Sequence, residues 1–224
     1  MMNMTVLDRN IDVSYLNKEL YDENGHLKIK DASFYEGIPH THLMLWCHQH
    51  GQYGLPTTEL IAWLKNHVIE GATIQVGAGN DSIGRTLGIP FTDSCLMKVP
   101  EVAAYYAMGG QPITKYPDDI IELEAAAAIK KYKPKVVIGC WITHLYREDE
   151  HFRGGNMYGI DEDFILDNVD KYIVIGNNKT HDKKRIIERK HTTHKFPWLF
   201  SRSMYPLENM IYVWENEHKR RRIE

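Results

Sequence analysis

Two nearly continuous apolar runs constrain the fold of this chain more than any other feature of its sequence. One run covers residues 135–141 and the other covers residues 171–176, and both are short and rich in valine and isoleucine. Strands that are covered on both faces have this character, and they are typical of parallel sheets. The sequence therefore predicts a mostly parallel sheet with helices on both of its faces.

Further strand and helix patterns alternate along the chain. Strands are expected at 73–76, 89–92, 112–115, 135–141, 171–176 and 210–214, and helices at 57–64, 118–133 and 163–169. Such alternation joins parallel strands through crossover helices, although the direction of the last strand stays open. We therefore predict an α/β fold, a Rossmann-like three-layer sandwich, over residues 55–224. Residues 1–54 have no clear periodicity, and we interpret them as an N-terminal extension packed on the core.

Composition is typical of a globular protein without a membrane segment. The chain has 224 residues, of which 43% are apolar and 25% are charged, which is enough for one domain with a full core. It contains no run of eighteen apolar residues, and its first ten residues do not have the pattern of a signal peptide. Three widely spaced cysteines do not indicate a disulfide framework. We expect a cytoplasmic protein.

The charge of the chain is unevenly distributed. The net charge is −3, but residues 179–202 contain eight Lys or Arg and only two Asp or Glu. A local excess of this kind either attracts an anionic substrate or forms a solvated surface. A surface that follows nucleic-acid phosphates needs a larger basic area, and no nucleic-acid-binding motif is present. The sequence therefore does not favour a nucleic-acid partner.

A glycine-containing loop follows the strand at residues 73–76. Gly77, Ala78 and Gly79 lie between that strand and the start of a short helix. Glycines permit a tight turn and the close approach of a ligand, and ligands of open α/β sheets bind beyond the carboxyl ends of strands. Asp93 ends the next predicted strand, where its carboxylate can accept both hydroxyls of a ribose. The pattern predicts an adenosine-binding site; the alternative is a tight turn without a ligand.

This loop resembles a motif of a known enzyme family. The run from Ile74 to Gly84 is similar to the first motif of the class I S-adenosylmethionine-dependent methyltransferases. The resemblance implies S-adenosylmethionine as the cofactor, an Asp93 contact to its ribose and an Asp118 contact near its adenine. Trp141 is a candidate for stacking on the adenine or on a planar substrate. The expected cofactor-binding residues are Gln75, Gly77, Ala78, Gly79, Asp93, Asp118 and Trp141.

Two positions in the loop depart from the family pattern. Gln75 stands where the family usually has Glu or Asp, and Asp81 stands where a third glycine would be. These departures suggest a non-catalytic relative with a binding or regulatory role as an alternative function. Residues 141–144 also differ from the signature of the family's DNA amino-methylating enzymes, which argues against that activity.

The chain also offers candidates for the chemistry itself. His144 follows the strand at 135–141, at the carboxyl edge of the sheet, and its ordinary pKa of about 6.5 suits a general base. Thr143 beside it and Asn177, after the strand at 171–176, are predicted to lie on the substrate side. The basic stretch 183–195 is expected to form a substrate-side loop.

Two other functional classes were weighed. Gly77, Gly79 and Ser82 fit a dinucleotide fingerprint in part, so an NAD(P)-dependent oxidoreductase is a second alternative. His40, His42, His48 and His50 surround Cys47 and have ligand chemistry suited to zinc. No Cys-x-x-Cys pair accompanies them, so no metal site is predicted. The leading prediction is a methyltransferase whose acceptor the sequence does not identify.

Overall fold

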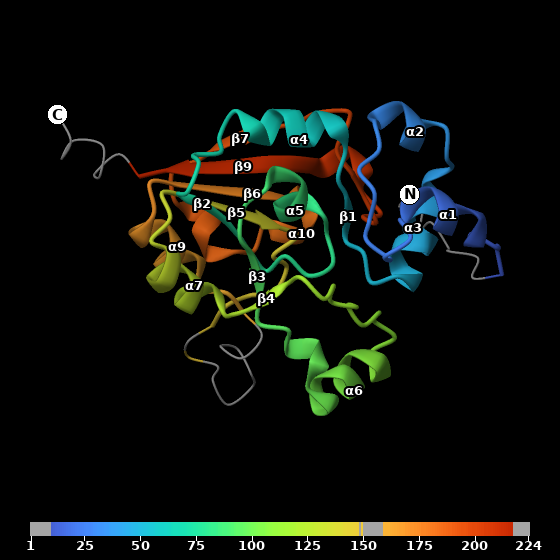
Figure 1. Cartoon of the computed structure of the whole chain (residues 1–224), viewed down its shortest axis with the longest axis horizontal. Helices are drawn as coiled ribbons and strands as arrows, with labels where there is room; N and C mark the ends of the chain where they lie inside the picture. The colour runs from blue at the N-terminus through green and yellow to red at the C-terminus, as the bar shows by residue number, and fades with distance from the viewer. Residues whose placement is uncertain (1–9, 148, 150–158, 217–224) are drawn as a thin grey trace.

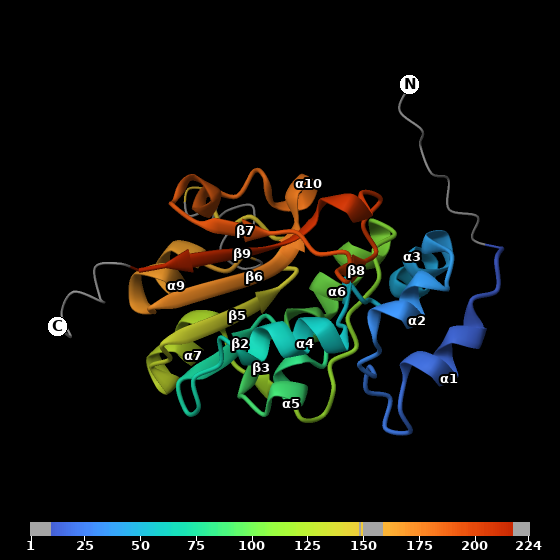
Figure 2. The ribbon, with the colours of Figure 1, turned by 90° about the horizontal axis from the view of Figure 1, so that it is seen from above.

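A seven-stranded sheet forms the centre of the part of the chain that the computed structural model describes, residues 10–147, 149 and 159–216. The strand order is β4-β3-β2-β5-β6-β9-β7, which can be followed in Figures 1 and 2. The strands are β2 (Thr73–Val76), β3 (Phe91–Asp93), β4 (Ile121–Glu122), β5 (Val136–Cys140), β6 (Lys171–Asn177), β7 (Thr192–His194) and β9 (Asn209–Glu215). From β4 to β6 all neighbours are parallel, whereas β9 runs antiparallel to β6 and β7. The predicted α/β class and mostly parallel sheet are confirmed.

Helices cover both faces of this sheet (Figure 1). They are α4 (Thr58–Lys65) and α5 (Ile83–Leu87) on one face, and α7 (Ala125–Tyr132) and α9 (Glu162–Asn168) on the other. Alternate side chains of β5 serve the two faces: Val136 and Ile138 pack on the α4 side, and Val137 packs on the α7 and α9 side. The continuous apolar character of this strand thus reflects burial on both faces.

Side-chain caps mark where α4 and α9 begin. The Thr57 hydroxyl accepts a hydrogen bond from the Leu60 amide at 3.1 Å before α4, and the Asp161 carboxylate accepts one from the Phe164 amide at 2.9 Å before α9. Each cap satisfies an amide that has no partner inside its own helix. The further helical segments are α6 (Pro100–Met108), α10 (Asn178–His181), η2 (Leu96–Lys98), η4 (Arg185–Glu188) and η5 (Pro206–Glu208). None of the helices in the described ranges has the length and apolar character needed to cross a membrane.

The region between β3 and α7 differs from the prediction. No strand forms at 112–115, and the third parallel strand is β4, where a helix had been expected to begin at Asp118. The helix begins only at Ala125. Ile121 pairs with Thr92 of β3, and the Leu123 amide donates to the Asp93 carbonyl at 2.8 Å. Short apolar runs fit helix and strand alike, and here pairing with a neighbouring strand decides the outcome.

The N-terminal part packs around a core of its own beside one end of the sheet (Figures 1 and 2). It consists of η1 (Ser14–Leu16), α1 (Asn17–Leu20), α2 (Ala32–Glu36) and α3 (His40–Gln49). Its core includes the fully buried Trp46. The short strand β1 (Gly54–Leu55) then pairs antiparallel with β8 (Phe200–Ser201), so that Gly54 lies opposite Ser201. This pairing brings two distant segments of the chain together beside the main sheet.

Candidate functional site

A cavity of about 540 Å³ lies at the carboxyl ends of β2, β3 and β5, and we name it the first cavity. Its walls include the loop after β2, the end of β3 and the loop after β5. The chain runs outward from β2 through β3 to β4 and then crosses back to β5 on the other side of β2, so the strand order reverses between β2 and β5. Open α/β sheets bind ligands at such a point, where the strand order reverses. The fold therefore puts the first cavity where a ligand is expected.

The glycine loop lines this cavity, with Gly77, Ala78 and Gly79 all on its wall. Both glycines have left-handed backbones, with φ of +58° and +57°. The Ala78 amide donates to the carbonyl of Thr92 at 3.0 Å and ties the loop to β3. A Cβ on Gly79 would meet only the Thr114 methyl at 3.7 Å, so this glycine leaves open space beside the backbone.

Asp93 joins the glycine loop to the next strand end. Its Oδ2 accepts a hydrogen bond from the Gly79 amide at 2.9 Å, and its Oδ1 accepts one from the Cys95 amide at 2.8 Å. Burial raises the pKa of the Asp93 carboxyl above its ordinary value, and the two amide hydrogen bonds act against that effect. A carboxylate has about four lone-pair sites, so each oxygen keeps capacity for a further donor in the cavity.

Gln75 and Asp81, the two departures from the family motif, form a hydrogen bond with each other. The Gln75 Nε2 donates to Asp81 Oδ2 at 2.8 Å, and the Gln75 Oε1 accepts from the Gly84 amide at 2.7 Å. Asp81 Oδ1 accepts from the Ile83 amide at 2.9 Å. Gln75 is fully buried under the loop, outside the cavity lining, and burial raises the pKa of Asp81 to about 6. A carboxylate at position 75 would oppose the Asp81 carboxylate, so the amide is the side chain that fits.

Two other predicted residues lie away from the cavity. Asp118 is exposed in the turn before β4 and does not line the first cavity, whereas its neighbour Asp119 pairs with Arg85. Asn177 is fully buried at the end of β6, where its Nδ2 donates to the Tyr205 carbonyl and to Asn209 Oδ1, each at 2.8 Å. The Asn177 side chain thus anchors the loop before β9 through hydrogen bonds and lines neither cavity.

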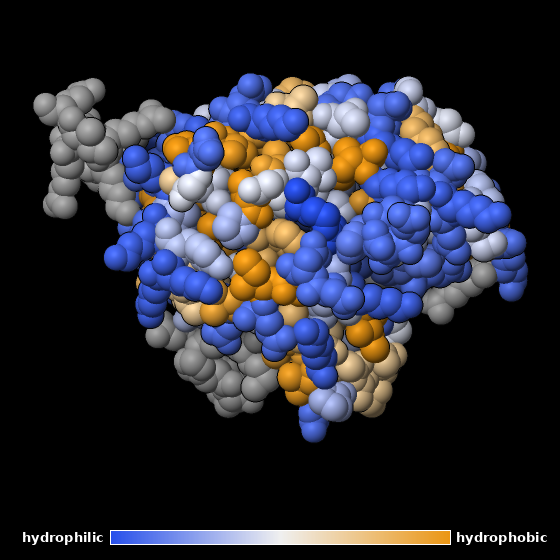
Figure 3. Space-filling model, in the orientation of Figure 1, coloured by the Kyte–Doolittle hydropathy of each residue, from blue (hydrophilic) through white to orange (hydrophobic). Residues whose placement is uncertain are grey.

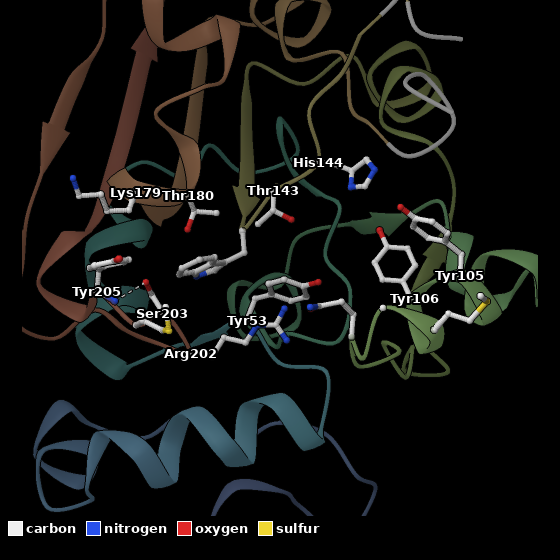
Figure 4. Close-up of a pocket in the computed structure, with 15 residues that line it drawn as sticks. Tyr53, Tyr105, Tyr106, Thr143, His144, Lys179, Thr180, Arg202, Ser203 and Tyr205 are labelled. Carbon is white, nitrogen blue, oxygen red and sulfur yellow. Dashed lines mark hydrogen bonds between the residues drawn. The ribbon is translucent and has the colours of Figure 1, made fainter. Parts of the chain in front are cut away.

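A second cavity, of about 760 Å³, adjoins the first (Figure 4). The two share the side chains of five residues, namely Tyr53, Tyr106, Trp141, Thr143 and His144. Trp141 directly follows β5 with a φ of +54°. Its indole packs against Gly54 so closely that a Cβ added to Gly54 would lie 2.8 Å from the indole Nε1. The predicted residues Trp141, Thr143 and His144 therefore form the boundary between the two cavities.

His144 has the protonation state that a general base requires. Burial lowers the pKa of its imidazole below the ordinary value, and the nearby charge of Lys184 acts in the same direction. The ring is consequently neutral at neutral pH and able to accept a proton. In Figure 4 it lies near Tyr105 and Tyr106, on the α6 side of the second cavity.

Two basic residues of the stretch 183–195 are paired with acidic residues of the α9 region. Lys184 forms a buried ion pair with Glu162, and Arg189 contacts Asp163 at 3.0 Å and Asp167 at 2.8 Å. The acidic side of α9 therefore neutralises Lys184 and Arg189, whereas Lys183 and Arg185 are exposed and line a further cavity, so the substrate-side role of the stretch stays a prediction. Of the wider basic segment 179–202, the residues that line the second cavity are Lys179 and its neighbour Thr180 at one end and Arg202 at the other.

The histidines near Cys47 have separate partners. The His40 Nε2 contacts the Ser203 carbonyl at 2.8 Å, the His42 Nδ1 contacts the Tyr15 hydroxyl at 2.9 Å, and His50 stacks on Trp46. Cys47 itself is fully buried. Within the described ranges, no three His, Cys, Asp or Glu side chains gather in an arrangement suited to a metal ion.

Several cavity residues had no signal in the sequence. The aromatic walls of the second cavity come from segments far apart in the chain, and the tyrosines not anticipated are Tyr53, Tyr105, Tyr106 and Tyr205, whereas Arg202 ends the basic segment 179–202 that the charge distribution indicated. An excess of tyrosine is the one hint that the sequence offers, and it does not indicate which tyrosines meet. A comparison with models of known protein families gives no match, and a search of curated proteins finds no significant similarity.

Proposed function

We propose that this protein is a Rossmann-like, S-adenosylmethionine-dependent methyltransferase that binds its cofactor in the first cavity. One observation carries the proposal: the Gly77–Gly79 loop and the Asp93 carboxylate meet at the point where the strand order reverses. A carboxylate held there by the loop's own amide is suited to ribose hydroxyls. The resemblance of the loop to the methyltransferase motif supplies the identity of the nucleoside cofactor.

The first cavity fits such a molecule in size and lining. Its volume of about 540 Å³ falls within the range of roughly 300–1,000 Å³ that is common for ligand sites. Asp93 retains acceptor capacity for a diol, and Gly79 leaves room for close approach. Beyond Asp93 the lining includes the apolar side chains of Leu96, Met97 and Val102, which suit a purine ring. When bound, S-adenosylmethionine would supply an electrophilic methyl group.

The chain's own residues would orient the acceptor and handle its proton. Trp141 and Thr143 form the wall between the cavities, so a group held in the second cavity can face the first. His144, neutral at neutral pH, can accept a proton from an acceptor that must lose one. Methyl transfer otherwise depends on positioning and on the exclusion of water.

The two alternative functions fit less well. In the dinucleotide-binding fold the sixth strand continues the parallel sheet next to the fifth. In this chain the corresponding position, next to β6, is taken by β9, which runs antiparallel. Ser82, the third position of the dinucleotide fingerprint, points to the Leu27 carbonyl at 2.6 Å instead of lining the cavity. The departures that suggest a non-catalytic relative, Gln75 and Asp81, satisfy each other and leave the cavity open.

A thermal-shift comparison separates the three functions. A ligand present at about 100 times its Kd stabilises a protein by about 2.7 kcal/mol, which corresponds to roughly 5–10 °C in Tm for a chain of this size. We expect that shift with S-adenosylmethionine and S-adenosylhomocysteine and none with NAD⁺ or NADP⁺. A shift with a dinucleotide alone would support an oxidoreductase, and no shift with any of them would support a non-catalytic role.

A further inference from the structure

The second cavity opens onto the first through shared walls, so the chemistry of its lining bears on the acceptor. Tyr53 and Trp141 line both cavities, with their rings tilted and their centroids 6.5 Å apart. A compound bound between the walls of the second cavity therefore reaches the wall of the first. The following inference rests on the proposed function, because it treats the second cavity as the acceptor site.

Aromatic and apolar side chains form the mouth of the second cavity. Tyr105 and Met108 of α6 are 67% and 89% exposed, and Met204 and Tyr205 across the opening are 55% and 40% exposed. Figure 3 shows apolar residues gathered at the end of the molecule that α6 forms. Figure 4 shows Tyr105 and Tyr106 on one side and Tyr205 on the other. Large apolar groups at a cavity mouth favour a ligand with flat apolar faces.

Positive charge without an acidic residue beside it in the described lining is the second property of this cavity. Arg202 lies with its guanidinium carbon 3.7 Å from the centre of the Tyr53 ring. The Arg202 Nη1 is buried and has no hydrogen-bond acceptor among the described residues. No acidic residue lines the cavity in those ranges, and Lys179 adds a second cation. A buried donor without an acceptor is costly, so this guanidinium is suited to an acceptor that a ligand supplies.

The fold fixes Arg202 in this position. The Arg202 amide donates to the Tyr53 carbonyl at 3.0 Å, directly after the pairing of Gly54 with Ser201. The Ser201 hydroxyl donates to Asn209 Oδ1 at 2.9 Å and anchors the same segment to β9. These bonds fix the backbone at Arg202, and its planar guanidinium, which lies over the Tyr53 ring, matches a carboxylate or phosphate in geometry as well as in charge.

We propose that the methyl acceptor is a small aromatic compound with an anionic group, whose ring lies among the aromatic walls and whose anion binds Arg202 and Lys179. A volume of about 760 Å³ suits a small molecule, and the net charge of −3 does not favour a nucleic-acid strand. The anion is a carboxylate of an aromatic acid or a phosphate of a nucleotide. Both present oxygens that accept hydrogen bonds from a guanidinium.

Two pairs of probes distinguish these sources and isolate the charge. The carboxylate pair is 4-hydroxyphenylacetate with 4-hydroxyphenylacetamide, and the phosphate pair is uridine 5′-monophosphate with uridine. Each is titrated by calorimetry into protein with and without saturating S-adenosylhomocysteine. The variants are Arg202→Gln and Arg202→Lys, and Arg185→Gln is the matched control because its side chain is 87% exposed and outside the cavity.

The proposal predicts that the anion of at least one pair binds about tenfold or more tightly than its neutral partner. Arg202→Gln should reduce that ratio to roughly two or less, Arg202→Lys should retain part of it, and Arg185→Gln should leave it unchanged. The pair that responds identifies the carboxylate or the phosphate as the anion. The lysine variant keeps the test valid if the glutamine variant does not fold.

Three outcomes would overturn this inference: equal binding within both pairs, no binding of either anion at about 10 mM, or an unchanged ratio in Arg202→Gln. Failure of the proposed function gives a different pattern. In that case S-adenosylhomocysteine does not bind, while the anion preference and its dependence on Arg202 remain. If S-adenosylhomocysteine binds and neither anionic probe does, the proposed function stands and only the proposed acceptor is wrong.

Discussion

Replacing either glycine of the cavity loop with alanine tests the geometry of that loop. Gly77 and Gly79 both have left-handed backbones, with φ near +58°, where an alanine costs about 1–2 kcal/mol. At Gly77 the new Cβ would also lie 2.5 Å from Ile142 Cδ1 and 3.1 Å from Ile160 Cδ1. Forcing those side chains apart costs a further 1–3 kcal/mol or so. Gly77→Ala should therefore reduce the free energy of unfolding by about 2–5 kcal/mol.

Gly79→Ala lacks this second cost because its Cβ would meet only the Thr114 methyl at 3.7 Å. We expect a loss of about 1–2 kcal/mol from the backbone alone. The effect of either alanine on the unfolded chain is of similar size, so it largely cancels when the two variants are compared. In Gly79→Ala the new methyl group would extend toward the space of the first cavity, so S-adenosylhomocysteine should bind this variant about tenfold or more weakly.

Urea unfolding followed by circular dichroism measures the first effect, and calorimetry measures the second. Gly77→Ala should be the less stable variant by about 1–3 kcal/mol, with the slope of the transition unchanged. Equal stabilities, or a less stable Gly79→Ala, would refute the packing described for Ile142. Normal ligand binding by Gly79→Ala would refute the open approach at that glycine.

Three further substitutions test separate parts of the structure. Lys184→Met leaves the Glu162 carboxylate buried without its cation and should cost about 3–5 kcal/mol in thermal unfolding, whereas adding Glu162→Gln should recover part of the loss. Burial raises the pKa of Asp81 to about 6, so its contribution to stability is fully present below its unfolded pKa and is lost as the pH rises through the folded value. The stability of Asp81→Asn relative to the unmodified protein should accordingly rise by about 2–2.5 kcal/mol between about pH 4 and 7. Denaturation at both pH values measures this change, and a constant difference would contradict it. Gly54→Ala would put a methyl 2.8 Å from the Trp141 Nε1, and the displaced indole should weaken nucleoside binding about tenfold in calorimetry; unchanged binding would mean that Trp141 does not shape the site.

The parts of the fold that the sequence predicts are those with a local cause. Residues 135–141 and 171–176 are nearly continuous in apolar character because both faces of β5 and β6 are covered. The glycine loop is recognisable because strand, turn and helix start follow one another directly. Asp93 is recognisable because it ends the next strand. Each of these signals lies within a few residues of the feature that it predicts.

The missed parts depend on contacts between distant segments. β4 has two residues, and its apolar spacing also fits the helix that was expected there. The pairing of β1 with β8 brings Tyr53 to Arg202, 149 residues further along the chain, and so contributes two walls of the second cavity. Two-residue strands have no periodicity that could predict such a pairing.

The two departures from the family motif show a related limit. Read separately, Gln75 and Asp81 suggest a damaged site, whereas the structure joins them in one hydrogen-bonded pair under the loop. Asn177 looked like a substrate contact because it follows a strand at the correct edge, but its side chain is occupied by backbone and Asn209 partners. Position along the sequence indicates which edge of a sheet a residue reaches, and packing decides which way it faces.

Calorimetric titration of S-adenosylhomocysteine into three proteins tests the central claim most directly. The proteins are the unmodified chain, Asp93→Ala, and Asp118→Ala as the matched control, because Asp118 is exposed and outside the cavity. The account predicts micromolar binding to the unmodified chain and the control, and a loss of about a hundredfold or more in Asp93→Ala. No binding to the unmodified chain at millimolar ligand, or equal binding to all three proteins, would contradict it.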